Sequence, residues 1–182
     1  MRIAFVGSHG TGKSTLADEI QYNTMGGQDW SIKESVARPF RSLIKRLNLD
    51  DNNSQLLINE LSFWNWESNV DIQNLVFTRT PIDNVAYTMV NANDEFSKSL
   101  AVEYHSKLKK LSWGDTIFMY LPIEFPLVND GVRPMDPAYQ EAVDKQMRLL
   151  LEELQINYYV IKGPVDERIS SIDGILKLRM GK

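Results

Sequence analysis

The feature that most constrains the fold is a glycine-rich segment near the N-terminus, residues 7–14, with the sequence Gly-Ser-His-Gly-Thr-Gly-Lys-Ser. It matches the pattern G-x-x-x-x-G-K-[ST] at every fixed position. The apolar run at residues 3–6 predicts a strand, and Leu16 and Ile20, four residues apart, predict a helix over residues 13–22. A continuous apolar strand is typical of a parallel sheet that is covered on both faces. The order strand, glycine-rich turn, helix therefore indicates an α/β fold.

The chemistry expected of this segment follows from its backbone. Glycines adopt backbone angles that other residues resist, so successive amide N–H groups can point into one concavity, and the next helix adds the positive end of its dipole. We expect Lys13 to reach the β- and γ-phosphates of ATP and the Ser14 hydroxyl to bind Mg²⁺. The alternative is a glycine-rich turn without a ligand. The predicted nucleotide site comprises Gly7, Ser8, His9, Gly10, Thr11, Gly12, Lys13, Ser14 and Thr15.

The rest of the chain continues the alternation of strands and helices. Further strands are predicted at 30–33, 74–78, 116–121 and 158–161, and further helices at 38–49, 54–70, 81–90, 93–111, 138–154 and 166–178. Residues 50–53, Asp-Asp-Asn-Asn, are expected to separate the first two of these helices, and the second carries Leu57, Leu61 and Trp64 along one stripe. This alternation predicts a three-layer α/β fold, a parallel sheet flanked by helices, with the loops after the strands gathered at one edge. We expect one domain over residues 1–182, with a proline-rich, lid-like segment at about 122–137.

Candidate residues for a phosphoryl acceptor follow the second predicted strand. Glu34 comes directly after it, and a carboxylate there can orient an acceptor hydroxyl and take its proton. The alternative is an exposed charge or a residue that opens a helix. Arg38, Arg41 and Lys45 share one helical face, which predicts either a solvated stripe or a surface for an anionic acceptor.

Two arginines are placed to act on the moving phosphoryl group. Arg79 ends the third strand, where a guanidinium can clamp a phosphate, and Asp83 is placed to complete a helix cap with Thr80. Arg133 lies in the proline-rich segment and is either a lid residue that closes over ATP or a surface arginine. For His9 we expect a solvent-facing side chain, with a catalytic role as the alternative. The candidate catalytic residues are Lys13, Glu34, Arg79 and Arg133, and the candidate acceptor-binding residues are Glu34, Arg38, Arg79 and Asp83.

Composition narrows the classes of function. The 182 residues include two histidines and no cysteine. The absence of cysteine excludes disulfides, thiolate zinc sites and cysteine nucleophiles. The formal net charge of −4 gives no support for a sequence-independent coat on nucleic acid, although a local basic patch is compatible with it. No apolar run approaches the ~20 residues that span a bilayer. We expect a soluble cytoplasmic protein without a membrane partner.

Four segments together resemble a known family. Residues 7–14, 33–38, 78–87 and 130–133 are similar to those of the AAA-type small P-loop kinases akin to ribosylnicotinamide kinase, a group with many phage-encoded members. The resemblance spans nearly the whole chain, up to Arg168, and the fold of this group is similar to that of nucleoside and nucleoside-monophosphate kinases. If the chain is phage-encoded, its location would be the host cytoplasm.

The resemblance implies the P-loop NTPase fold with five parallel strands in the order 2-3-1-4-5. It also implies that Glu34 lies near the acceptor, that Arg133 is the lid arginine, and that ATP and Mg²⁺ are the cofactors. Relatives often carry an Asp-Arg or Glu-Arg pair where this chain has Thr78-Arg79. That substitution removes the carboxylate expected to make the second contact with Mg²⁺.

Three hypotheses of function follow. The first is an ATP-dependent kinase that phosphorylates a hydroxyl or phosphate of a nucleoside, nucleotide or similar small metabolite, with a homodimer possible. The second is a kinase acting on DNA, at a 5′ end or at a hydroxymethylated base such as 5-hydroxymethyluracil, with phosphate contacts from Arg38, Arg41, Lys45, Arg46 and the cluster Lys107, Lys109, Lys110. The third is a non-kinase ATPase or nucleotide switch. The third is disfavoured because no strand of four apolar residues ends in an Asp-Glu or Asp-Asp pair.

Overall fold

The computed structural model describes residues 1–37, 51–127 and 135–181. In these ranges no helix has the length and apolar character needed to cross a membrane. The elements, in chain order, are β1 Arg2–Val6, α1 Lys13–Tyr22, a short 3₁₀ turn Met25–Gly27, β2 Ser31–Lys33, α3 Asp51–Glu67, β3 Leu75–Phe77, α4 Pro81–Val90, α5 Glu95–Leu108, β4 Thr116–Tyr120, α6 Pro137–Glu153, β5 Tyr158–Val160 and α7 Val165–Arg179.

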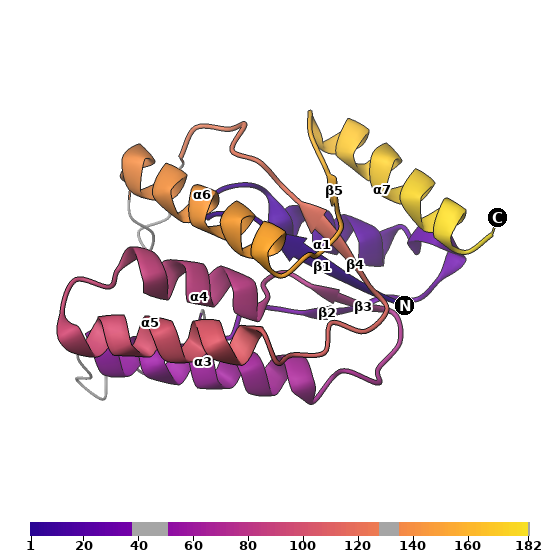
Figure 1. Ribbon diagram of the computed structural model, residues 1–182. Coiled ribbons are helices and arrows are strands. Elements are labelled where there is room, and N and C mark those ends of the chain that lie inside the picture. The colour runs from indigo at the N-terminus through magenta and orange to yellow at the C-terminus, as the bar shows by residue number, and fades with distance from the viewer. Residues whose placement is uncertain (38–50, 128–134, 182) are drawn as a thin grey trace.

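The five strands form one parallel sheet in the order β2-β3-β1-β4-β5. This confirms the order implied by the family resemblance. β1 lies at the centre, where Ala4 pairs with Phe77 of β3 on one side and with Phe118 of β4 on the other. Because all pairs are parallel, the carboxyl ends of all five strands lie at one edge of the sheet (Figure 1). Ligands of such folds bind at that edge.

Side chains of β1 alternate between two separate hydrophobic cores. Ala4 and Val6 face one core, to which α3, α4, α5 and α6 contribute, and Ile3 and Phe5 face the other, to which α1 and α7 contribute. All four side chains are fully buried. The result is the predicted three-layer arrangement, in which the described residues place four helices over one face of the sheet and two over the other (Figure 1).

Helix α3 corrects the sequence-based prediction at its start and on its buried face. We predicted that residues Asp50 to Asn53 end the preceding helix and that the next helix begins at residue 54, but α3 begins at Asp51. Asp and Asn are unfavourable inside helices, yet they are favoured at N-termini, where the first N–H groups lack partners inside the helix. The same residues that predict a break therefore also suit a beginning. The helix predicted over 38–49 lies outside the described residues.

The buried face of α3 also differs from the expected one. The spacing of Leu57, Leu61 and Trp64 predicts a core stripe, but Trp64 is 66% exposed, whereas Phe63 and Trp66 are buried. Trp66 packs on the sheet, with its ring centroid 4.8 Å from that of Phe77. Apolar residues occur all round this helix, so its contacts with the sheet, α4 and α5 decide which of them are buried.

Candidate active site

The glycine-rich loop connects β1 to α1 and has the conformation that its glycines permit. Gly10 and Gly12 have φ angles of 79° and 87°, in the left-handed region that disfavours side chains. At Gly7 a Cβ atom would lie 2.5 Å from the carbonyl oxygen of Leu121, which leaves no space for a side chain. Gly12 directly precedes the first turn of α1, so the unpaired N–H groups of the helix start adjoin the loop.

Lys13 folds back over this loop. Its side chain is buried, and its Nζ donates hydrogen bonds to the carbonyl oxygens of Gly7 and Ser8 and to Thr11 Oγ1, the last at 3.2 Å. Thr11 Oγ1 in turn donates to the Ser8 carbonyl at 3.0 Å. The Lys13 side chain therefore reaches from the start of α1 to the residues that follow β1. Ser14, next along α1, is partly exposed.

His9 is buried between two helices, so the expectation of a solvent-facing side chain was wrong. Its exposed fraction is 2%, and its ring Nδ1 lies 2.9 Å from the hydroxyl of Tyr87 on α4. The backbone N–H of His9 donates to the same hydroxyl at 3.1 Å, and its carbonyl accepts from Gln140 Nε2 of α6 at 2.6 Å. α4 and α6 pack over this end of the loop and bury the ring, a tertiary contact that the local sequence does not specify.

The start of α4 has the predicted cap. The Ile82 N–H donates to Thr80 Oγ1 at 3.2 Å, and Asp83 Oδ2 accepts from the Thr80 N–H at 2.9 Å and from its hydroxyl at 2.8 Å. Asp83 is fully buried, and burial raises the pKa of its carboxyl group against the opposing influence of Lys13, Arg79 and Thr80. Among the described residues, Asp83 Oδ1 has no hydrogen-bond partner.

Arg79 lies beside this carboxylate. Its guanidinium sits over the ring of Tyr87, with Cζ 5.1 Å from the ring centroid. Burial lowers the pKa of Arg79, but Tyr87, Asp83 and Tyr139 outweigh it and hold the pKa above its ordinary value, so the group stays charged. The ends of β1 and β3 thus bring together two of the predicted catalytic cations, Lys13 and Arg79, with Asp83 interacting electrostatically with both.

Of the remaining predicted site residues, the structure describes Glu34 but not Arg38 or Arg133. Glu34 follows β2 at the same edge of the sheet and is exposed. The carbonyl oxygen of Lys33, just before it, accepts a hydrogen bond from the Thr78 N–H at 3.0 Å, so the ends of β2 and β3 adjoin. Arg38 and Arg133 lie outside the described residues, so the structure does not relate either one to the loop.

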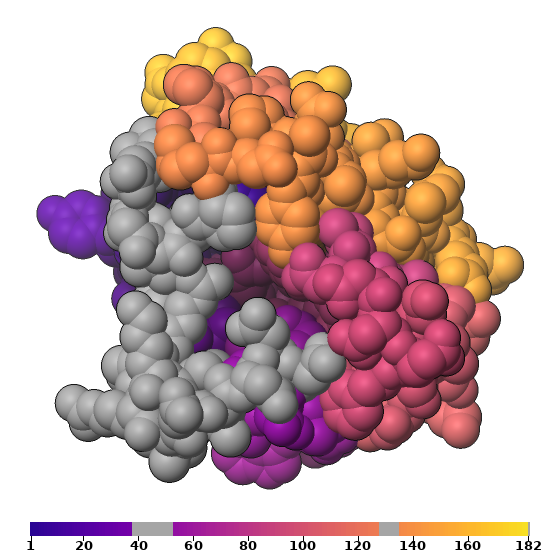
Figure 2. Space-filling view, turned by 90° about the vertical axis from the view of Figure 1, so that its left-hand side faces the viewer, coloured from indigo at the N-terminus to yellow at the C-terminus, as the bar shows by residue number. Residues whose placement is uncertain are grey.

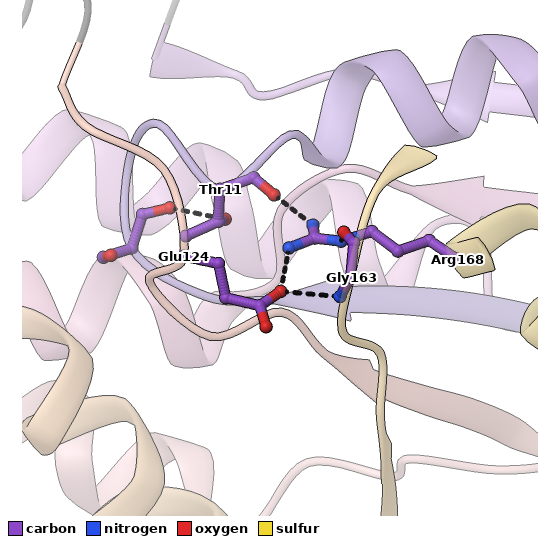
Figure 3. Close-up of polar contacts among 5 residues, drawn as sticks. Thr11, Glu124, Gly163 and Arg168 are labelled. Carbon is purple, nitrogen blue, oxygen red and sulfur yellow. Dashed lines mark hydrogen bonds and ion pairs between the residues drawn. The ribbon is translucent and has the colours of Figure 1, made fainter. Parts of the chain in front are cut away.

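Arg168, which no sequence motif singled out, also contacts the loop, and Glu124 binds Arg168 (Figure 3). Arg168 is 1% exposed; it donates through Nη1 to the Thr11 carbonyl at 2.8 Å, through Nε to the Gly163 carbonyl at 2.8 Å and through Nη2 to Glu124 Oε2 at 2.6 Å. Burial raises the pKa of Glu124, but Arg168 and the Gly163 N–H outweigh it and hold the pKa below its ordinary value.

A signal for Arg168 was present in the sequence. It stands four residues before Ile172 and eight before Leu176, and these three are the buried residues of α7. A cation at helical spacing on an apolar face must find partners within the protein, because burying an unpaired charge is costly. That pattern indicates a buried arginine, although it does not identify the atoms that accept its hydrogen bonds.

The surface at this edge is hollowed. Figure 2 looks onto the carboxyl ends of the strands and shows a recess between the purple and magenta atoms of α3 and α4 and the orange atoms of α6. Its position matches that expected for a ligand of a parallel α/β sheet.

Solved structures of known proteins share this fold. Deoxyadenosine kinase from M. mycoides, with the products dCMP and dCDP bound, aligns with a TM-score of 0.74 and 18% identity over 98% of this chain and 100% of that chain. NadR protein in complex with NR aligns with a TM-score of 0.72 and 18% identity, over 100% of this chain and 52% of that one. Thymidylate kinase from Ehrlichia chaffeensis aligns with a TM-score of 0.64 and 16% identity, over 97% and 98% of the two chains. At these identities the likeness establishes the fold.

The family is established by sequence. No curated protein matches this chain closely enough to count as a relative. The model of the AAA domain family, however, matches residues 2–168, which run from β1 to Arg168 and include the whole glycine-rich loop. Because that match covers most of the 182 residues, the chain belongs to the AAA domain family, as its four sequence segments predicted.

Proposed function

We propose that this protein is an ATP-dependent kinase that moves the γ-phosphoryl group of Mg-ATP to a hydroxyl or phosphate of a nucleoside, a nucleotide or a related small metabolite. The observation that carries the proposal is the complete phosphate loop with Lys13 buried across it, beside Arg79 and Asp83. The shared fold with nucleoside and nucleotide kinases supports the same class of reaction.

The proposed chemistry needs positioning and positive charge more than covalent participation by the protein. In phosphoryl transfer the charge is spread over the oxygens of the moving group, and fixed donors stabilise it. The loop amides and Lys13 would hold the β- and γ-phosphates, and Arg79 would contact the moving group from the end of β3. Because Tyr87, Asp83 and Tyr139 hold the pKa of Arg79 above its ordinary value, its guanidinium is charged at any working pH.

The residues at this edge fit a magnesium ion. Mg²⁺ prefers hard oxygen ligands, of which one or two come from the protein. The Ser14 hydroxyl is available on the first turn of α1, and Asp83 Oδ1 is a buried carboxylate oxygen that lacks a partner within the described ranges. Ser14 and Asp83 would hold the ion directly or through water. The Asp83 carboxylate would then replace the one missing at Thr78. When bound, Mg²⁺ would neutralise charge on the phosphates.

The recess that α3 and α4 border opposite α6 suits an acceptor with a nucleobase. Asn84, next to Asp83, has a buried Nδ2 without a hydrogen-bond partner in the described residues, and the same is true of Asn59 Oδ1 on α3. Gln55 and Asn59 both donate to Thr88 Oγ1 at 2.9 Å, which fixes these two helices against each other. One unused donor and one unused acceptor match the edge of a base, which presents both kinds of group.

An acceptor screen tests this proposal. Release of ADP is measured with Mg-ATP and a panel of nucleosides and nucleotides, using wild-type protein, the Glu34→Gln variant and, as a matched control, Glu67→Gln at the end of α3. We expect acceptor-dependent turnover that falls roughly 100-fold in Glu34→Gln if this carboxylate is the general base, and stays unchanged in the control. Turnover that no acceptor stimulates would contradict the kinase assignment and favour the ATPase hypothesis.

The DNA hypothesis loses one of its supports. Lys107 pairs with Glu60 at 2.7 Å and with Glu103 at 2.9 Å, and Lys109 pairs with Glu153 at 2.7 Å. These ion pairs neutralise most of the basic cluster that was expected to contact DNA phosphates. A small-molecule acceptor is therefore the better proposal, while the homodimer, the phage origin and the cytoplasmic location stay predictions.

A further inference from the structure

Arg168 links three segments that follow three different strands. Thr11 lies in the phosphate loop after β1, Glu124 follows β4, and Gly163 follows β5. Glu124 closes the arrangement by accepting a second hydrogen bond, from the Gly163 N–H at 2.9 Å. Phe125 covers the guanidinium, with its ring centroid 4.8 Å from Cζ (Figure 3 shows the polar contacts).

Core packing alone does not explain an arginine at this position. The neighbouring buried residues of α7, Ile172 and Leu176, are aliphatic, and an aliphatic residue at 168 would bury its side chain without the cost of desolvating a charge. What the guanidinium adds is a fixed fork of donors, two of which reach backbone carbonyls of separate loops. Its contacts therefore set the position of one loop relative to the other.

The contact with Thr11 also fixes the direction of an amide group in the phosphate loop. In a planar trans peptide the C=O and the following N–H point in opposite directions. Because Nη1 of Arg168 holds the Thr11 carbonyl at 2.8 Å, the N–H of Gly12 points away from Arg168. Gly12 lies in the turn that begins α1, so this N–H belongs to the donors that a polyphosphate would meet.

We propose that Arg168, held by Glu124, is a positioning residue for the nucleotide donor, which orients the phosphate-loop amides and fixes them relative to the loop after β5. The proposal rests on the proposed function. The loop at residues 163–165 follows the last strand at the edge where a donor base would lie, and Gly163 has a φ angle of 91° that fits it to this turn. When the separation of the two loops is fixed, a nucleoside triphosphate can contact both at once. The free-energy cost of ordering the loops is then met during folding and not during binding.

The test measures binding of Mg-ATP, which requires no knowledge of the acceptor. Isothermal titration calorimetry compares wild-type protein with Arg168→Gln, Arg168→Lys and Glu124→Gln. Arg179→Gln is the matched control, because Arg179 is also on α7 and also lies over an aromatic ring, with Cζ 6.0 Å from the Tyr159 centroid. We expect roughly tenfold weaker binding in Arg168→Gln, a smaller loss in Arg168→Lys and Glu124→Gln, and no change in Arg179→Gln.

Steady-state kinetics separate positioning from general stability. With an acceptor from the screen, the KM for Mg-ATP should rise in parallel with the dissociation constant, while the KM for the acceptor stays within about twofold of the wild-type value. If Arg168→Gln does not fold, the affinity of Glu124→Gln for Mg-ATP tests the proposal instead. The Glu124 side chain is partly exposed, and glutamine has nearly the same shape, so this variant should fold. Wild-type affinity in Arg168→Lys and Glu124→Gln, or an equal rise in both KM values, would overturn the inference. A wild-type protein that does not bind Mg-ATP overturns the proposed function itself.

Discussion

The phosphate loop and the helix pair α3–α4 adjoin the same recess, but different interactions hold them. Protein donors occupy the carbonyl oxygens of the loop: Lys13 binds those of Gly7 and Ser8, Gln140 that of His9, and Arg168 that of Thr11. Between α3 and α4 the contacts join side-chain amides and a hydroxyl, and within the described residues two amide atoms, Asn59 Oδ1 and Asn84 Nδ2, are left unpaired.

Under the proposed function, this difference corresponds to separate tasks for the two regions. Donors that hold a loop carbonyl also fix the direction of the N–H group that follows it, and every nucleoside triphosphate offers the same phosphates to such N–H groups. Side-chain amides, in contrast, distinguish one planar edge from another. We therefore expect changes in the phosphate loop to affect all acceptors equally, and changes in α3–α4 to alter which acceptor is used.

The largest effect should come from Lys13→Ala. Removing the ammonium group takes away both the expected phosphate contact and the hydrogen bonds that close the loop, so kcat/KM should fall roughly 100- to 1,000-fold. Initial rates with several acceptors measure it, with Lys177→Ala as the control, because Lys177 forms an exposed ion pair with Asp173 on α7. A loss confined to one acceptor would break the proposed division between the two regions.

The same division explains what could be predicted from the sequence. The loop is one contiguous motif, so its place between a strand and a helix was correctly predicted, and the sheet order followed from the family resemblance. The contacts of His9 and Arg168 were not predicted, because their partners Tyr87, Gln140 and Glu124 are 78, 131 and 44 residues away along the chain. Such contacts depend on how the layers pack.

The acceptor region was harder to predict for the same reason. The position of Glu34 was predictable because it follows a strand, where topology alone determines its place, and its role in binding an acceptor stays a prediction. The polar pair Asn59 and Asn84 comes from two helices, and nothing in either local sequence marks these two residues as buried with unpaired amide atoms. The face of α3 was assigned wrongly because apolar residues surround the helix, so periodicity could not distinguish Trp64 from Trp66.

The next effect in size should come from Asn84→Ala. If Asn84 Nδ2 binds the acceptor, its loss should raise the KM for the acceptor about tenfold and leave the KM for Mg-ATP unchanged. The acceptor found in the screen provides the assay, and Asn93→Ala, an exposed residue just before α5, is the control. A rise in the KM for Mg-ATP instead would place Asn84 with the donor region.

A smaller effect is expected from Tyr87→Phe, because Tyr87 lies on α4 but contacts the phosphate loop. The change removes the hydroxyl that holds the ring and the N–H of His9 at 2.9 and 3.1 Å. We expect the KM for Mg-ATP to rise roughly fivefold, with the KM for the acceptor unchanged. Tyr22→Phe is the matched control, because Tyr22 is 86% exposed. A rise in the KM for the acceptor alone would show that Tyr87, like Asn84, acts on acceptor binding and not on the phosphate loop.

The smallest effect concerns the stability contributed by Asp83, the carboxylate between the two regions. Burial raises its pKa in the folded protein, despite Lys13, Arg79 and the hydrogen bonds from Thr80. As pH rises from the ordinary carboxyl pKa of about 4 to the raised value, the unfolded chain loses the proton first. The free energy of unfolding therefore falls over that window and is level above it. Asp83→Asn keeps an oxygen for the Thr80 N–H and does not ionise, so it should lack this loss.

Thermal melts without nucleotide or metal, from pH 4 to pH 8, measure the difference between wild-type and Asp83→Asn proteins. Other carboxylates titrate alike in both proteins, so the difference isolates Asp83. The melting temperature of the variant, relative to wild type, should rise with pH by roughly 2–4 °C and then level off. With Mg-ATP added, the wild-type protein should have the higher melting temperature of the two. The ion would use the Asp83 Oδ1 atom, which the free protein leaves unpaired within its described residues. If the difference falls with rising pH, the Asp83 carboxylate is stabilised by its neighbours, and its oxygen is not held in reserve for a ligand.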